Sequence, residues 1–345
     1  MNTNRAMRGV AAVELLVVAA AGALLLTMTI TGARGIRARG RQASCLENLH
    51  RIGAATLAYS IDDPRNQAVP LHRMHVSIHM GDGFPPEYAW RTALPFSFGG
   101  RTATVPMPTA QGNVTVMTDP AGYWGAKTKP LNSYLAGPAS VGLETFHCPA
   151  DTGFVEDWGW EAPAEAAGIP CFDILGNSYR STRLGIVWAS GSAAHGFVTS
   201  APHGHTAASL EGPLAETVLY CDPFFYDYSH SLSNDPDLPP LPGWHGELMA
   251  DNVAYCDGSA RQTQLGELYD FTDEELDEMG VTADFPSRYF LRRGPNWRMD
   301  VYPTPGAVIQ VYQDNGWLAF DVVSSLQAAG YRGWPFADFQ VNEAP

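Results

Sequence analysis

An apolar stretch near the N-terminus dominates the hydrophobic pattern of this chain. From Val10 to Ile30 every residue is apolar or small except Glu14, Thr27 and Thr29. A helix needs about 20 such residues to cross a bilayer, so the pattern predicts a transmembrane helix over residues 10–31. Arginines lie on both sides of the stretch, and their distribution does not decide which end faces the cytoplasm.

A second helical pattern covers residues 45–61. Its apolar or small residues recur at helical spacing, with charged residues between them, and the sequence Asp62-Asp63-Pro64 ends it. Joined to the apolar stretch, it predicts one long helix from near Val10 to Ile61. Glycines weaken a helix, so we expect a kink or break at Gly32, Gly35 or Gly40.

The remainder of the chain has short apolar runs and many turn residues, with 34 glycines and 26 prolines in the whole sequence, which favours β structure. Hairpins are predicted at residues 252–264, with Asp257-Gly258 at the turn, and at residues 307–322. Thr272 and Glu275 predict a capping box that opens a short helix. Further strands are expected at residues 114–117, 184–189 and 217–220. The fold class is therefore α+β, with a long N-terminal helix followed by a large β-rich domain.

Composition and charge narrow the function. Hydrophobic residues make up 45% of the chain, which excludes disorder of the whole protein. The net charge is −15, and residues 1–51 hold seven arginines against two glutamates, so the rest of the chain carries −20. A body this acidic repels phosphate backbones, and we expect no nucleic-acid partner.

Glu14 is the one acidic residue within the apolar stretch, and a carboxylate in apolar surroundings needs a cation nearby. A cut after Gly9 would place the new α-ammonium of Val10 about one turn from Glu14, in the same or a neighbouring copy. The run from Gly9 to Val18 resembles the leader of type IV prepilins and pseudopilins. The resemblance implies that Gly9 is the cleavage residue, Val10 the methylated N-terminus and Glu14 the residue that registers subunits in a filament.

Later fragments are similar to a subgroup of these proteins that carries a C-terminal H-X9-DG signature. The chain departs from that signature because eleven residues separate His245 from Asp257. The fragments are Cys45–Gly53, Phe146–Asp151, Asn177–Tyr179, and His245 followed by Asn252–Gly258. The implied organisation is a leader at residues 1–9, the transmembrane helix at 10–31, its extracytoplasmic continuation at 32–63 and a β-rich extracytoplasmic globular domain at 64–345.

The resemblance implies a structural role rather than an enzymatic one, as a pseudopilin or minor pilin of a type II secretion or type IV pilus-like system. The expected partners are a prepilin peptidase, other pilin-like subunits, the secretion or pilus assembly machinery and the lipid bilayer. The expected location is the inner (cytoplasmic) membrane, with a single pass and the large domain outside. No cofactor is expected.

Other interpretations stay open at this point. The apolar stretch also fits an uncleaved anchor or a secretory signal cut after Ala33. The body also fits a membrane-anchored metal-dependent enzyme. Two separate aromatic pairs would suit a module that binds carbohydrate or another partner: Tyr123 with Trp124, and Trp158 with Trp160.

The cysteines and histidines are the remaining chemical candidates. Five cysteines lie in a body expected outside the cytoplasm, where thiols pair. Since Cys45 and Cys148 both lie in fragments that match the family, the resemblance suggests a disulfide between them. A structural zinc site is disfavoured because the sequence has no Cys-x-x-Cys pair. The candidate metal ligands are His72, His75 and His79, which share a face only if their segment is helical.

Overall fold

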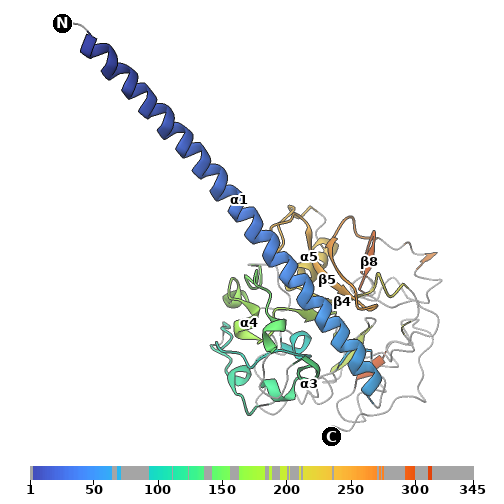
Figure 1. Ribbon diagram of the computed structural model, residues 1–345. Coiled ribbons are helices and arrows are strands. Elements are labelled where there is room, and N and C mark those ends of the chain that lie inside the picture. The colour runs from blue at the N-terminus through green and yellow to red at the C-terminus, as the bar shows by residue number, and fades with distance from the viewer. Residues whose placement is uncertain are drawn as a thin grey trace.

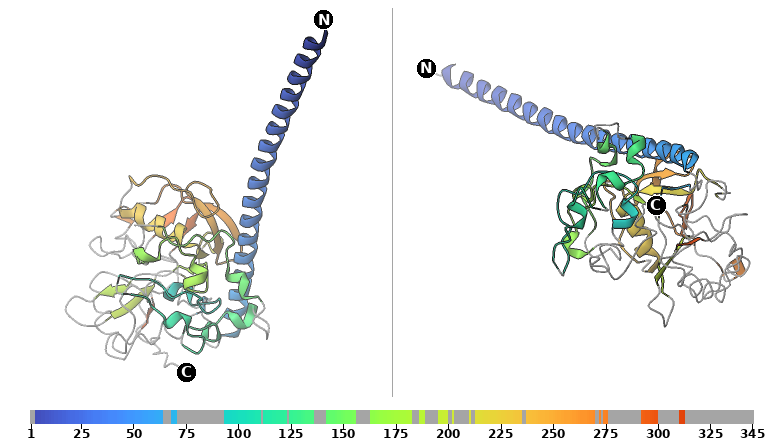
Figure 2. Two further views of the ribbon diagram at one scale, coloured as in Figure 1. Left: turned by 90° about the vertical axis from the view of Figure 1, so that its left-hand side faces the viewer. Right: turned by 90° about the horizontal axis from the view of Figure 1, so that it is seen from below.

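A computed structural model gives the architecture. It describes residues 3–63, 68–70, 93–110, 112–122, 124–135, 142–155, 163–182, 186–188, 195–199, 202, 210, 213–234, 237–269, 272, 274–275, 292–299 and 310–312. The chain begins with one long helix, α1 (Thr3–Asp62), which is about 90 Å long at 1.5 Å per residue. Figure 1 shows its N-terminal half projecting away from a folded body, and Figure 2 shows that the body lies on one side of its C-terminal half.

The helix α1 continues through Gly32, Gly35 and Gly40 without a break, so the predicted interruption is wrong. Its C-terminal part is amphipathic, as predicted. The buried side chains recur every three or four residues and include Cys45, Leu49, Ile52 and Thr56, whereas Leu57 is exposed. This stripe fixes which face of α1 packs on the body.

The predicted transmembrane helix over residues 10–31 is also wrong. Within the part of the chain that the structure describes, no helix has an apolar stretch long enough to cross a membrane. The large apolar side chains described in this part of α1, from Leu15 to Met28, are exposed. The α+β content expected from the sequence is confirmed.

The main sheet is antiparallel and has the strand order β1-β4-β5-β6. Its strands are β1 (Arg180–Ser181), β4 (Val218–Cys221), β5 (Ala250–Tyr255) and β6 (Ala260–Gln264). Strands β5 and β6 form the predicted hairpin, and Gly258 at its turn has a φ of +83°, which a side chain disfavours. The expected strand at 217–220 is confirmed as β4.

A second antiparallel sheet has the order β2-β3-β9, and a short two-stranded sheet joins β7 to β8. The expected strand at 184–189 is confirmed as β2. Of the predicted hairpin at 307–322, only β9 is described, and β9 pairs with β3; the returning arm lies outside the described residues. The strands are β2 (Ile186–Trp188), β3 (His195–Thr199), β7 (Arg293–Gly294), β8 (Trp297–Arg298) and β9 (Gln310–Tyr312).

The remaining described elements are short helices around the sheets. Residues 114–117 do not form the expected strand, because Val114 makes only an isolated bridge with Met107 and a 3-10 turn follows. Thr272 and Glu275 do form the predicted capping box, since each accepts a hydrogen bond from the backbone N–H of the other. The helices are η2 (Leu94–Phe96), η3 (Val116–Thr118), η4 (Ala126–Thr128), α3 (Asn132–Leu135), η5 (Leu143–Phe146), η6 (Ala164–Ala166), α4 (Cys171–Ile174) and α5 (Pro223–Asn234).

The core between α1 and the main sheet positions the site described below. Leu49 and Ile52 of α1 are fully buried together with Phe146, Tyr220 and Ala254. The helix approaches the β5–β6 turn closely, because a Cβ added at Gly53 would lie 3.3 Å from the carbonyl oxygen of Gly258. His50 Nδ1 lies 2.9 Å from the same oxygen and donates to it as Nδ1–H.

Candidate functional site

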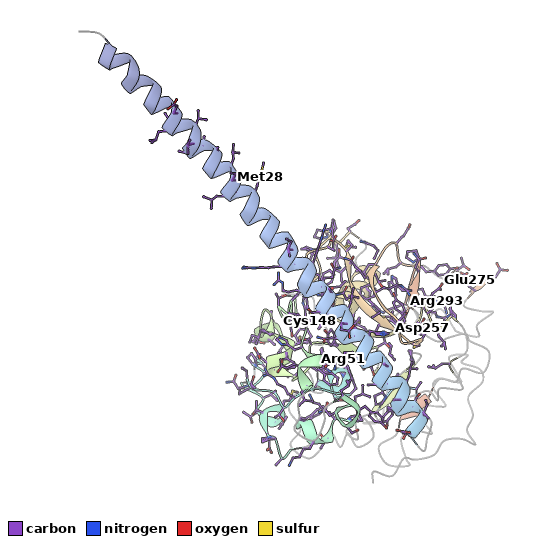
Figure 3. All side chains as sticks on the ribbon, in the orientation of Figure 1. Met28, Arg51, Cys148, Asp257, Glu275 and Arg293 are labelled. Atoms are coloured by element: carbon purple, nitrogen blue, oxygen red, sulfur yellow. The ribbon has the colours of Figure 1, made fainter. Side chains whose placement is uncertain are left out.

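The projecting part of α1 carries apolar side chains on all of its faces. Four successive residues, Leu15, Leu16, Val17 and Val18, are each at least 62% exposed, and Met28 is 68% exposed. Figure 3 shows Met28 on the part of α1 that lies beyond the body, whereas Arg51 lies on the part beside the body. Because successive helical residues point about 100° apart, this segment has no single apolar stripe but an apolar circumference.

The predicted processing residues lie on the same helix. Gly9 and Val10 are within the helical backbone of α1, and the structure describes no more of them. Glu14 is exposed on the surface of α1, at the N-terminal end of the described apolar side chains. The predicted metal ligands His72, His75 and His79 lie outside the described residues. Of the predicted aromatic surface, Trp124 is buried, and the other members also lie outside the described part.

A second group of residues meets where α1 enters the body. Cys45 is the first residue of the buried stripe of α1 and is 1% exposed. Its Sγ accepts a hydrogen bond from the hydroxyl of Tyr179, at 3.4 Å. Asn48, one turn further along, donates from Nδ2 to the carbonyl oxygen of His147 at 2.9 Å. The helix is therefore tied to the segment that carries Cys148.

Cys148 is held by a turn that follows η5. Its N–H donates to Ser178 Oγ at 3.0 Å, and its carbonyl oxygen accepts from Asp151 N–H at 3.0 Å. The Ser178 hydroxyl in turn donates to the Asp151 carboxylate at 2.7 Å. The N–H of Ala150 donates to Cys148 Sγ at 3.4 Å. Backbone and side-chain hydrogen bonds thus fix both the position of Cys148 and the direction of its sulfur.

His245 lies on a tight loop just before β5. Hydrogen bonds from Gly243 N–H to Glu247 O and from Gly246 N–H to Gly243 O close this loop, and Gly246 has a φ of +81°. The His245 side chain is 1% exposed, and its Nδ1 is hydrogen-bonded to the Asp251 carboxylate. This contact turns Nε2 toward Cys148 Sγ, 3.5 Å away.

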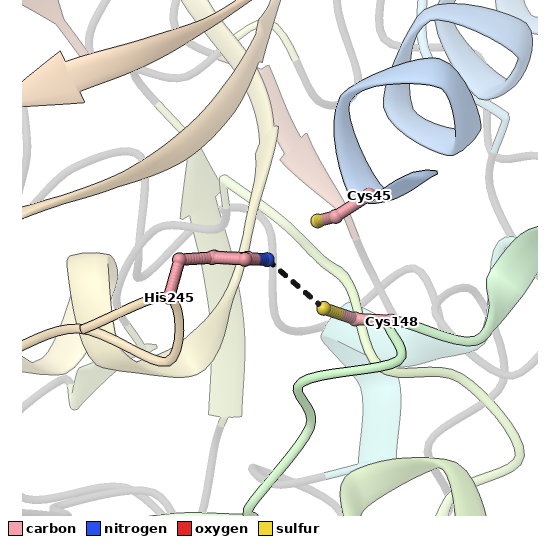
Figure 4. Close-up of side chains that lie close together, drawn as sticks. All are labelled: Cys45, Cys148 and His245. Atoms are coloured by element: carbon pink, nitrogen blue, oxygen red, sulfur yellow. Dashed lines mark hydrogen bonds between the residues drawn. The ribbon is translucent and has the colours of Figure 1, made fainter. Parts of the chain in front are cut away.

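The three side chains point toward one another from three separate segments (Figure 4). One ligand atom from each of Cys45, Cys148 and His245 lies within 4.8 Å of the other two. The structure thus brings together the two cysteines that the resemblance paired, but both are free thiols in it. Their disulfide stays a prediction.

The electrostatics of the cluster favour a charged sulfur. Burial raises the pKa of the Cys45 thiol. Hydrogen bonds from Cys148 and His245 and the charge of His245 outweigh this effect and lower the pKa to about 6. Burial raises the pKa of Cys148, and the neighbouring Cys45 raises it further. Burial lowers the pKa of His245, but Asp251 and Cys45 raise it to about 9. The surroundings therefore favour a thiolate at Cys45 and an imidazolium at His245, and disfavour a second thiolate at Cys148.

The carboxylate behind His245 is itself enclosed. Asp251 is 0% exposed, and its oxygens accept from Trp244 N–H at 2.6 Å and Asn252 N–H at 2.8 Å as well as from His245. Burial and then the charge of Asp251 raise the pKa of the neighbouring Asp222 well above its usual range. The raised pKa favours the neutral form of Asp222, the second buried carboxyl group beside Asp251.

Asn252 is the fourth polar side chain at the cluster. Its Nδ2 lies 3.4 Å from His245 Nε2 and 3.3 Å from the carbonyl oxygen of Gln42. Its Oδ1 is buried and has no hydrogen-bond partner. A buried polar atom left unpaired is uncommon and costs free energy, so this oxygen is a candidate for an interaction with a bound group.

The arrangement has three possible chemistries. Two sulfurs and an imidazole nitrogen are the donor set of a zinc site. Two adjacent thiols also suit disulfide formation. A thiolate next to an imidazole that is held by a carboxylate also resembles a cysteine nucleophile, its base and the group that orients the base. However, Cys45 is 1% exposed and Cys148 is 0% exposed, so a substrate cannot reach either sulfur.

The resemblance to known fragments found most of this cluster. Cys45, Cys148, Tyr179 and His245 all belong to fragments singled out above. Asp251 and the role of Asn252 were missed, because a carboxylate six residues after a histidine has no distinctive spacing. The usable signal was the longer interval between His245 and Asp257, since that interval contains Asp251.

None of the protein-family models matches the chain, and neither the curated proteins nor the solved structures gave a match.

Proposed function

We propose that this protein is a structural assembly subunit, of the pseudopilin or minor pilin type, in a type II secretion or type IV pilus-like system. The N-terminal part of α1 packs against the same helix of neighbouring subunits, and the body is displayed around the resulting helical core. The observation that carries the proposal is the apolar circumference over residues 15–28, which projects beyond the body with its side chains exposed.

The same helix from other subunits is the partner that suits this apolar surface. A helix that is apolar all round is stable only when it is enclosed on all sides, and a bundle of parallel copies encloses each member. The run of small residues from Ala19 to Ala23 lets two backbones approach closely. The body is much wider than the helix in every view, which favours a minor or capping subunit over a closely packed major one.

Glu14 gives the packing a register. Enclosing its carboxylate without a cation would cost several kcal/mol, of the order of 3–5. Cleavage after Gly9 supplies such a cation as the α-ammonium of Val10 in a neighbouring subunit. The ion pair forms only when adjacent helices are correctly offset, so it selects one arrangement.

Photo-crosslinking of the full-length chain tests the assembly. A photo-reactive residue at Val18 should give covalent dimers and higher species, because this position lies in the helix–helix contact. The same residue at Ile61 is the matched control, since Ile61 is 80% exposed but lies at the other end of α1. Only monomers from position 18, or equal yields from both positions, would contradict the proposal.

The role of Glu14 has its own test. Glu14→Ala should reduce crosslinking at position 18 about tenfold or more, since unpairing the neighbouring amine costs more than 1.4 kcal/mol. Glu47→Ala is the control, because Glu47 is an exposed acidic residue beside the body on the same helix. Unchanged crosslinking in Glu14→Ala would remove the ion pair from the mechanism.

Processing is tested by the mass of the N-terminal peptide of the protein from its native source. The expected peptide begins at methylated Val10. A peptide that begins at Met1 or Arg34 would show that the leader is not cut after Gly9, and would leave Glu14 without its proposed partner.

A further inference from the structure

The donor atoms at the junction of α1 and the body have the composition and spacing of a closed metal site. Zinc binds cysteine sulfur at about 2.3 Å and histidine nitrogen at about 2.0–2.1 Å, so tetrahedral ligand atoms lie roughly 3.5–3.8 Å apart. Cys148 Sγ and His245 Nε2 are 3.5 Å apart. All three ligand atoms are within 4.8 Å of one another, so a shift of about 1 Å at Cys45 gives the tetrahedral spacing.

The groups behind these ligands are those that a metal site uses. A metal-bound histidine ordinarily donates its second ring N–H to a carboxylate, which fixes the ring. His245 makes this contact with Asp251, a buried residue. Each sulfur also accepts one hydrogen bond, Cys45 from the Tyr179 hydroxyl and Cys148 from the Ala150 N–H, and such bonds stabilise bound thiolates.

Asn252 provides an independent observation. Its buried Oδ1 has no hydrogen-bond partner, whereas its Nδ2 lies 3.4 Å from His245 Nε2. The oxygen and nitrogen of an amide exchange places when the group turns by 180°. After this turn the oxygen would lie beside the imidazole nitrogen, on the side of the ring that faces the cysteines.

A disulfide between the cysteines would not account for these features. It would need neither a buried imidazole held by a carboxylate nor an amide oxygen left unpaired. We propose that Cys45, Cys148 and His245 bind one Zn²⁺ ion, with the Asn252 amide oxygen at the fourth position. Two thiolates and one imidazole form the donor set that zinc prefers. This site goes beyond the proposed assembly function and does not depend on it.

The ion fastens three distant parts of the sequence to one another. Its ligands come from α1, from the turn after η5 and from the loop before β5. Because the sulfurs are buried and the ligands fill the coordination positions, the site is structural and holds α1 at a fixed place on the body. The ligands are separated by roughly a hundred residues in each case, so the ion constrains the unfolded chain strongly.

Metal analysis of the purified full-length protein is the primary test. We expect about one zinc per chain. Cobalt exchanged into the site should give the absorption of thiolate-to-cobalt charge transfer. Cys148→Ser should lose both signals, while Cys256→Ser, which removes a buried cysteine outside the cluster, should keep both.

A second variant keeps the test independent of folding defects in the cysteine mutants. Asp251→Asn keeps all three ligands and should weaken zinc binding about 10- to 100-fold, as loss of an outer carboxylate does. Competition with a coloured zinc chelator measures this. Wild-type protein with less than a tenth of an equivalent of zinc, whose Cys45 and Cys148 both react as free thiols after unfolding, would overturn the proposal. A Cys45–Cys148 disulfide in non-reducing peptide mapping would overturn it as well.

Discussion

Lys129 shows how the body encloses a charged side chain by giving it backbone partners. It is 4% exposed, and its Nζ donates to the carbonyl oxygens of Arg101 and Leu175, both at 2.9 Å. Burial, followed by the charge of Arg101, lowers the pKa of Lys129 from 10.5 to about 7. The folded protein therefore releases this proton at a much lower pH than the unfolded chain.

The contribution of Lys129 to stability should consequently rise with pH. Between pH 7 and 10.5 the unfolded state holds a proton on Lys129 that the folded state has lost, so this contribution to the free energy of unfolding increases as pH rises. Lys129→Met should remove this increase. Urea unfolding of both proteins across the interval gives the comparison, and parallel pH profiles would contradict the assigned pKa.

Gly243 lets the Asp251 carboxylate reach the Trp244 N–H. A Cβ at Gly243 would collide with the Ala250 carbonyl oxygen and the Asp251 carboxylate. Gly243→Ala should therefore lower the free energy of unfolding by about 1–3 kcal/mol, measured by urea denaturation. Gly40→Ala is the control, because nothing lies within 4 Å of its added Cβ, and it should raise helix stability by up to about 1 kcal/mol. Equal effects would refute the steric argument.

At the scale of elements, α1 has two parts with different surroundings. Its C-terminal part buries one stripe against the main sheet, and its N-terminal part exposes apolar side chains on every face. In the proposed assembly, folding stability and subunit packing therefore depend on different residues of one helix. Substitutions in the two parts should separate these properties.

Ile52→Ala should lower the free energy of unfolding by about 3 kcal/mol, because the side chain is fully buried and its loss leaves a cavity. Leu25→Ala should change it by less than about 0.5 kcal/mol in the dilute monomer, since Leu25 is 66% exposed. Denaturation followed by tryptophan fluorescence measures both. A large loss of stability from Leu25→Ala would show that the projecting part packs on the body.

Elements with a local signal were predictable from the sequence. The amphipathic C-terminal part of α1, the β5–β6 hairpin and the capping box at Thr272 each depend on residues close together in the chain. The pairing of β9 with β3 was not predictable, because it joins segments more than a hundred residues apart. The transmembrane prediction failed because hydropathy counts apolar residues without showing what surrounds them.

At the scale of the whole molecule, charge is divided between the helix and the body. Arg37, Arg39 and Arg41 are exposed on α1 before it enters the body, and the chain beyond residue 51 carries −20. In the proposed bundle of parallel helices, the arginines of one subunit would face the acidic body of the next. Attraction between such opposite charges strengthens association and is screened by salt.

Assembly should therefore weaken as ionic strength rises. The double variant Arg37→Gln with Arg39→Gln should give less crosslinking at position 18 and a flatter dependence on salt. Arg51→Gln is the control, because Arg51 is exposed on α1 beside its own body. A variant that keeps the wild-type salt dependence would show that these charges do not meet across subunits.

The unbroken course of α1 has a mechanical consequence. Traction on the N-terminal half, as in a growing or retracting fibre, passes along a continuous hydrogen-bonded rod into the segment that begins at Cys45. There the rod lies along the body rather than ending on it, so the load is shared by Leu49, Ile52 and the close contact at Gly53. Such loading shears many contacts at once instead of peeling them one by one, and the junction at Cys45 is the first point to bear the tension.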